Sequence, residues 1–123
     1  MEKRIGRNRL FGITGLDPNP VFSLEKMLWM RENQPAAYSH TKKWLQMADY
    51  ILWKLCGTFA TDYTLASRTQ LLDIHTNQWS EELLKAFGIP REMLPELCKS
   101  GSAAGKVSEE AARVTRLSRN TLV

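Results

Sequence analysis

Glycine and proline residues break this 123-residue chain into short apolar segments, and that punctuation limits the folds open to it. The clearest segment has apolar residues at the i, i+3, i+4 and i+7 spacing of one helix face, namely Ala48, Ile51, Leu52 and Leu55. Gly57 supplies its stop. We expect a succession of short helices, hence a mostly α chain, with residues 1–123 forming a single unit that has no internal repeat or linker.

Local capping signals predict the remaining helices. Ser23 should cap a helix that ends near Asn33, because Pro35 disfavours helical geometry at the residue before it and suits the first turn of a second helix. Residues 58–60 lean toward β structure, and residues 73–78 are turn-like. Further caps are expected at Thr61 or Asp62, at Ser80 (with Gly88 as the stop) and at Ser108, whose helix should run from Glu109 to about Leu117.

Composition excludes several classes of protein. Hydrophobic residues make up 43% of the chain and charged residues 24%, which is ordinary for a soluble globular domain. No window approaches the run of about 18 apolar residues that a membrane span needs. The charged N-terminus lacks the apolar stretch of a signal peptide. We therefore expect a cytoplasmic protein.

The net charge of +4 raises the question of nucleic-acid binding. The basic residues gather near the two ends of the chain, and acidic residues are mixed through its middle. A binding surface would carry one dense basic face interleaved with aromatic residues. Nucleic acid is therefore not the partner we expect.

No pattern of reactive residues identifies an enzyme. Cys56 and Cys98 lack metal-ligand spacing, and each is interpreted as a small buried residue at the end of a helix. His40 and His75 are expected on the surface or in loops. Residues 101–106 suggest a phosphate loop, but they have one residue too few between the glycines and no Ser or Thr after the lysine.

The four tryptophans leave two interpretations open. Trp29 stands in an amphipathic segment beside Leu28 and Met30, where an aromatic ring can pack on the C–H face of a sugar or polyol. The alternative is that Trp29 and the other three tryptophans, Trp44, Trp53 and Trp79, fill the core.

Several blocks of sequence resemble the FGGY family of carbohydrate kinases. Residues 23–33 are similar to its first signature, Ser-x-x-Lys-x-x-Trp-apolar-x-Glu-Asn, with Val21 a mild departure in the flank. Residues 61–69, TDYTLASRT, resemble the family segment TDYxNASRT, with Leu65 in place of a frequent asparagine. Residues 73–80 and 88–95 and the pair Gly101 and Gly105 continue the order and approximate spacing, so that the resemblance covers residues 15–117.

The resemblance implies a two-domain kinase with a ribonuclease-H/actin-like α/β fold, in which the sugar binds mainly to the first domain and ATP with Mg²⁺ mainly to the second. This chain would then be an incomplete first domain without the ATP domain. By resemblance, Trp29 and Tyr63 contact the substrate, whereas Asp62 and Arg68 are structural. The aspartate that serves as catalytic base is expected beyond Val123, so the chain alone should be inactive and should bind sugar weakly or not at all.

A second hypothesis is a non-enzymatic helical interaction module. An exposed apolar face would serve such a module directly, and in an incomplete domain it would favour self-association. The sequence does not identify the sugar or polyol.

Overall fold

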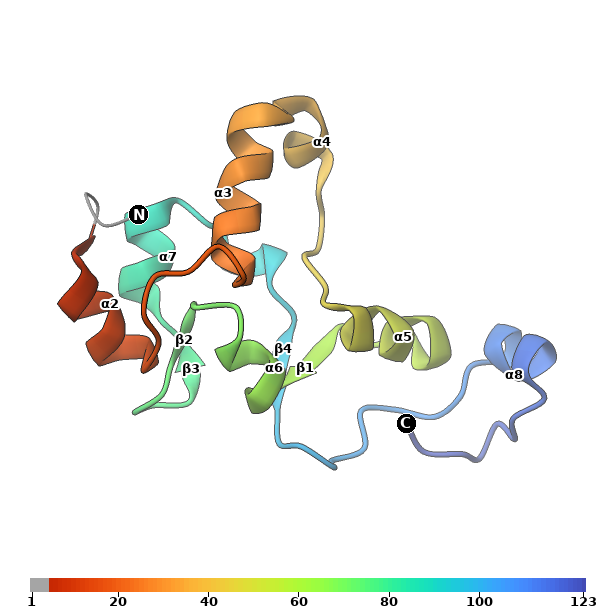
Figure 1. Ribbon diagram of the computed structural model, residues 1–123. Helices are drawn as coiled ribbons and strands as arrows, with labels where there is room; N and C mark the ends of the chain where they lie inside the picture. The colour runs from red at the N-terminus through yellow and green to blue at the C-terminus, as the bar shows by residue number, and fades with distance from the viewer. Residues whose placement is uncertain (1–4) are drawn as a thin grey trace.

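The computed structural model describes residues 5–123 as short helices around two small pairs of strands (Figure 1). The prediction of a mostly α chain is confirmed. The helices are α2 (Arg7–Thr14), α3 (Ser23–Asn33), α4 (Pro35–His40), α5 (Met47–Cys56), α6 (Tyr63–Ser67), α7 (Glu81–Phe87), α8 (Glu109–Thr115) and the 3-10 turn η1 (Arg91–Met93). The strands are β1 (Ala60–Asp62), β2 (Leu72–Asp73), β3 (Gln78–Trp79) and β4 (Glu96–Cys98).

Most helix boundaries follow the capping signals in the sequence. Helix α3 ends at Asn33, α4 begins with Pro35 in its first turn, and Gly57 ends α5 in the left-handed conformation with a φ of 78°. One cap was assigned a residue too late. Phe22 is the N-cap of α3, and Ser23 is already helical and makes no capping hydrogen bond.

Helices α7 and α8 show why the other caps could be predicted. The Leu83 N–H donates to the Ser80 hydroxyl at 3.4 Å, and the Ala111 N–H donates to Ser108 at 3.1 Å. Gly88 (φ 62°) ends α7, and the Ile89 N–H donates to the Leu84 carbonyl at 2.9 Å as in a Schellman motif. Helix α8 ends two residues earlier than expected, at Thr115.

The strands form two pairs, one between segments that are far apart in the chain and one between neighbouring segments. Strands β1 and β4 are parallel, with Ala60 opposite Glu96 and Asp62 opposite Cys98. Strand β4 was not predicted, because the parallel pairing that defines it is not a local feature of the sequence. Cys98 therefore ends a strand, and its predicted place at the end of a helix is wrong. Strands β2 and β3 form an antiparallel hairpin around the predicted turn.

The apolar core lies between α3, α7 and the segment around β2. Helix α2, which the sequence analysis did not predict, joins it through Leu10 and Ile13. The buried Trp79 donates from its indole Nε1–H to the Pro95 carbonyl at 2.9 Å, which ties the hairpin to the segment before β4. The largest fully buried apolar side chains of the core are Leu10, Leu24, Met27, Leu71, Leu83, Phe87 and Leu94.

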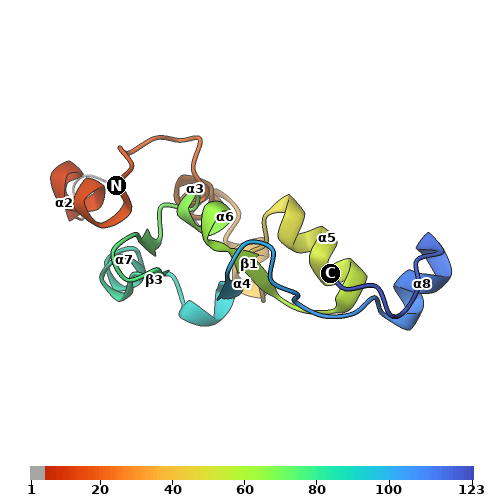
Figure 2. The ribbon, with the colours of Figure 1, turned by 90° about the horizontal axis from the view of Figure 1, so that it is seen from below.

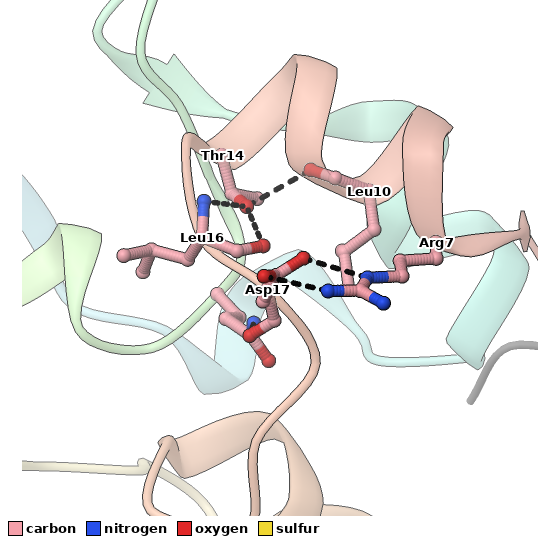
Figure 3. A network of polar contacts seen from close by, with 6 residues as sticks. Arg7, Leu10, Thr14, Leu16 and Asp17 are labelled. Atoms are coloured by element: carbon pink, nitrogen blue, oxygen red, sulfur yellow. Dashed lines mark hydrogen bonds and ion pairs between the residues drawn. The ribbon is translucent and has the colours of Figure 1, made fainter.

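Polar contacts fix the path from α2 into the loop that leads to α3 (Figure 3). The Thr14 hydroxyl donates to the Leu10 carbonyl at 2.9 Å and accepts from the Leu16 N–H at 3.2 Å. Arg7 holds Asp17 through two parallel hydrogen bonds of 2.9 Å each. The loop before α3 therefore leaves α2 in one defined direction.

The α5 and α8 end of the molecule is extended and poorly covered (Figure 2). The only buried residue of α5 is Asp49, whereas Met47, Tyr50 and Ile51 are 74%, 47% and 52% exposed. The accessible surface of 7716 Å² exceeds the roughly 6,700 Å² expected of a compact monomer of this mass. The predicted apolar face of α5 therefore exists but is only partly covered, with Ile51 exposed and Leu52 and Leu55 half-buried. No helix among residues 5–123 is both long and apolar enough to cross a membrane.

Candidate functional site

Trp29 lies on the outer face of α3, where its ring lines an open hollow. Its side chain is 55% exposed, in contrast to the 4% of Trp79, so the core interpretation holds for Trp79 and not for Trp29. Leu24, Met27 and Leu28 direct the opposite side of α3 into the core, and this orientation turns Trp29 outward. The hollow has a volume of about 500 Å³ and is lined by Pro20, Glu25, Lys26, Leu28, Trp29, Met30 and Glu32.

Backbone hydrogen bonds join the start of α3 to the end of α6. The Ser23 N–H donates to the Arg68 carbonyl at 3.4 Å, and the Leu24 N–H donates to the Thr69 carbonyl at 3.0 Å. The Arg68 guanidinium also lies over the Phe22 ring, 4.9 Å from its centroid. These contacts agree with the structural role expected of Arg68, and they connect the two segments that carry Trp29 and Tyr63.

Tyr63 is the first residue of α6 and follows β1 directly. Ligands of α/β proteins bind outside the carboxyl ends of parallel strands, and that is where Tyr63 lies. Its side chain is half-buried. It lines neither the hollow of Trp29 nor a second hollow of about 360 Å³, which Lys26 shares with the first and which reaches Arg68. In residues 5–123, then, the two predicted substrate residues lie on connected elements, but Tyr63 does not line the hollow that Trp29 lines.

Asp62 caps α6 and joins it to the segment after β4. Its Oδ1 accepts from the Leu65 N–H at 2.8 Å and from the Thr64 hydroxyl at 2.7 Å. Its Oδ2 accepts from the Ser100 hydroxyl at 2.7 Å. The Leu65 N–H, followed by the Thr64 hydroxyl, lowers the pKa of the Asp62 carboxyl, because these donors stabilise the ionised form. The structural role expected of Asp62 is confirmed, and the alternative cap Thr61 is buried instead.

The pKa of the Asp49 carboxyl is shifted in the opposite direction, upward. Asp49 is 3% exposed, and burial raises the pKa of its carboxyl because the charged form loses hydration. The Gln46 N–H donates to Oδ2 at 3.0 Å and partly offsets that effect. The buried Thr61 hydroxyl adds a weaker interaction without completing a hydrogen bond of normal geometry. Sequence analysis did not select Asp49, because a lone aspartate on a helix carries no local signal of burial.

The residues present do not suit a nucleotide–magnesium site. In the part of the chain that the structure describes, no three His, Cys, Asp or Glu side chains converge as metal ligands. Residues 101–106 lie in a largely exposed loop, where the Ser102 N–H is already bonded to the Lys99 carbonyl at 3.1 Å. We therefore derive no catalytic step through ATP or Mg²⁺ in this chain.

The histidines and cysteines remain outside this site. His40 and His75 are exposed, as expected, and His75 Nε2 lies 2.8 Å from the Gly12 carbonyl. Cys56 and Cys98 are both half-buried and unpaired.

Comparisons with known proteins show that the chain is similar to sugar kinases. The chain is 40% identical over 120 residues to a xylulose kinase of Lactococcus lactis, covering 98% of the chain and 24% of that protein. It is 34% identical over 117 residues to an L-fuculokinase of Escherichia coli, covering 95% of the chain and 25% of the relative. Among solved structures, a gluconate kinase from Lactobacillus acidophilus superposes with a TM-score of 0.89 at 26% identity, covering 98% of this chain and 25% of the other.

The model of the N-terminal domain of the FGGY family of carbohydrate kinases matches residues 1–123. The chain belongs to that family. It spans about a quarter of the length of the relatives that it matches.

Proposed function

We propose that this chain forms part of the sugar-binding domain of an ATP-dependent carbohydrate kinase and that residues 1–123 are an incomplete domain of that protein. The observation that carries the proposal is the exposure of Trp29 on a hollow large enough for a sugar, on a helix whose other side is fully packed. An exposed indole favours the C–H face of a polyol, and neighbouring polar groups orient its hydroxyls.

The fold supports the incompleteness of the domain. Strands β1 and β4 form a two-stranded parallel sheet, and parallel sheets are normally larger and covered on both faces. The apolar face of α5 is only partly covered by residues 5–123, with Ile51 still exposed. We propose that further strands and helices complete a ribonuclease-H/actin-like α/β domain here and cover that face.

Completion of the domain also accounts for Tyr63. Its place at the carboxyl end of β1 suits contact with a substrate hydroxyl, and the present open hollow would close only when the rest of the domain is added. Phosphoryl transfer requires an aligned hydroxyl, a base and a metal-bound nucleotide. Because residues 5–123 hold no cluster of three His, Cys, Asp or Glu side chains that could bind a metal, we expect residues 1–123 alone to be inactive.

The proposal is tested in the complete protein that carries this chain. Trp29→Ala should raise the KM for the preferred sugar about tenfold or more and change kcat less, because the ring contributes binding. Phe11→Ala removes a similarly exposed aromatic side chain from α2 and serves as the control. Equal kinetic effects of the two substitutions would contradict a substrate role for Trp29.

The exposed face of α5 favours a second candidate, a helical module that binds another protein. Met47 and Ile51 would then remain exposed in the complete protein and would be available to a partner. Hydrogen exchange distinguishes the two cases: protection of this face in the isolated, monomeric complete protein supports the kinase domain, and its absence supports the module.

A further inference from the structure

The turn between α6 and β2 contacts both the helix that carries Trp29 and the loop that leads to that helix. The Arg68 and Thr69 carbonyls accept from the first two N–H groups of α3, as described above. The next residue, Gln70, reaches the loop, where its Nε2–H donates to the Asp17 carbonyl at 2.7 Å. Three consecutive residues of one turn therefore hold α3 and the loop before it relative to each other.

That loop forms one wall of the hollow. Pro20 lines it together with Trp29. Only two residues separate Pro20 from Asp17, and the Phe22 N–H closes the turn around Pro20 by donating to the Asn19 carbonyl at 3.1 Å. Because this stretch of chain is short and folded into a turn, the position of the Asp17 backbone determines where Pro20 stands relative to the indole.

Two other side chains contact this loop, but both are exposed. Arg7 pairs with the Asp17 carboxylate at the surface, where an ion pair contributes little, and the carboxylate can turn without moving the backbone carbonyl (Figure 3). The ammonium group of Lys26 lies 3.3 Å from the Pro20 carbonyl at the end of a long side chain in solvent. Gln70 differs from both, because its side chain is fully buried and bonds the backbone itself.

Gln70 makes this contact at a local energetic cost. Its backbone has a φ of 61°, in the left-handed region that residues other than glycine seldom adopt. Within residues 5–123 its buried Oε1 has no hydrogen-bond partner, which is unfavourable for an amide oxygen removed from water. An apolar side chain of similar size would fill the same space without the second cost. What the glutamine adds is the N–H group that reaches Asp17.

We propose that Gln70 is a positioning residue that sets the width of the hollow and thereby the affinity for the substrate. It does not line the hollow. Through Asp17 it holds the Pro20 wall at a fixed place beside α3, so that a ligand packing on Trp29 meets a wall that is already formed, and such preorganisation lowers the cost of binding. This inference rests on the proposed function. Loss of the contact should weaken binding and leave the chemical step nearly unchanged.

The test uses two variants of the complete protein. Gln70→Met keeps the approximate size of the side chain and removes its amide group. Gln70→Asn keeps the amide and suits the left-handed backbone, but it is one methylene too short to reach the Asp17 carbonyl. Gln78→Met makes the first replacement at an exposed position of β3 and serves as the control.

KM and kcat are measured with xylulose, glycerol and gluconate, well below the Tm of each variant, and hydrogen exchange is followed in residues 16–22. Both Gln70 variants should raise the KM for the preferred compound about fivefold or more and change kcat less than about twofold, because binding alone is weakened. Exchange should become faster in residues 16–22 than elsewhere. Gln78→Met should leave all three quantities unchanged.

A purely structural role for Gln70 gives a different result. It would lower the Tm and leave the KM of the folded variants unchanged, and that outcome would overturn the inference. Unchanged exchange in residues 16–22 would overturn it as well. If Gln70→Met does not fold, Gln70→Asn decides. Failure of the proposed function is seen separately, because the unaltered, folded complete protein would then neither bind nor phosphorylate any of the three compounds with ATP and Mg²⁺, and the inference would fall with it.

Discussion

Replacing Asp62 with alanine should destabilise the junction of β1, α6 and the segment after β4. Loss of an aspartate N-cap costs about 1 kcal/mol. The hydroxyl groups of Thr64 and Ser100 also lose their acceptor, at roughly 0.5 kcal/mol each, because both can turn to water instead. The sum is about 2 kcal/mol, which for a domain of this size lowers the Tm by about 6–10 °C.

The pH dependence of this effect has a definite sign. The pKa of Asp62 is lowered in the folded state, so its contribution is complete above the unfolded value of about 3.9 and is lost as the pH falls through the folded value. The difference in Tm between the unaltered chain and Asp62→Ala should therefore be largest near pH 7. It should shrink below about pH 4.

Thermal unfolding followed by circular dichroism at several pH values measures both effects. Asp17→Ala is the matched control, because Asp17 is an exposed aspartate that pairs with the exposed Arg7 and caps no helix, so its loss should matter less. If Asp62→Ala and Asp17→Ala had equal Tm values at neutral pH, the capping argument would be refuted. A difference that persisted undiminished into acid would refute the electrostatic part.

Three further changes test the core, a helix contact and a buried charge. Phe87→Ala removes a fully buried ring and should cost about 3–5 kcal/mol in urea unfolding; a loss below about 1 kcal/mol would contradict the assigned core. Arg31→Gln removes the hydrogen bond that Arg31 donates to the Phe87 carbonyl at 2.6 Å and should speed hydrogen exchange at the carboxyl end of α7 selectively, and uniform exchange rates would argue against the contact. Because burial raises the pKa of Asp49, the free energy of unfolding should fall as the pH rises from about 4 toward the folded pKa. Asp49→Asn should flatten that pH dependence, and an unchanged slope in the variant would contradict the raised pKa.

Local chemistry made most helix boundaries predictable from the sequence. Gly57 and Gly88 adopt the left-handed conformation that ends a helix, and Ser80 and Ser108 make the capping bonds that their side chains favour. The exception at Ser23 is a shift of one residue, because the α3 N-terminus is held by the carbonyls of Arg68 and Thr69 and needs no hydroxyl cap.

Features set by distant contacts could not be predicted in the same way. Strand β4 is a strand because Glu96–Cys98 pairs with β1, more than 30 residues earlier in the chain. The apolar spacing around Ile51 predicted a helix correctly, but periodicity does not reveal whether a face is covered. The exposure of Trp29 and the burial of Trp79 likewise follow from what packs against each side chain, so the residues alone left both interpretations open.

The most direct test of the account is ADP release from ATP and Mg²⁺ across a panel of sugars and polyols, measured in parallel for residues 1–123 and for the complete protein that carries them. We expect the complete protein to phosphorylate at least one of these compounds and residues 1–123 to stay at background. Turnover by residues 1–123, or none by the folded complete protein with any sugar, would contradict the claim that this chain supplies only the sugar-contacting part of a kinase.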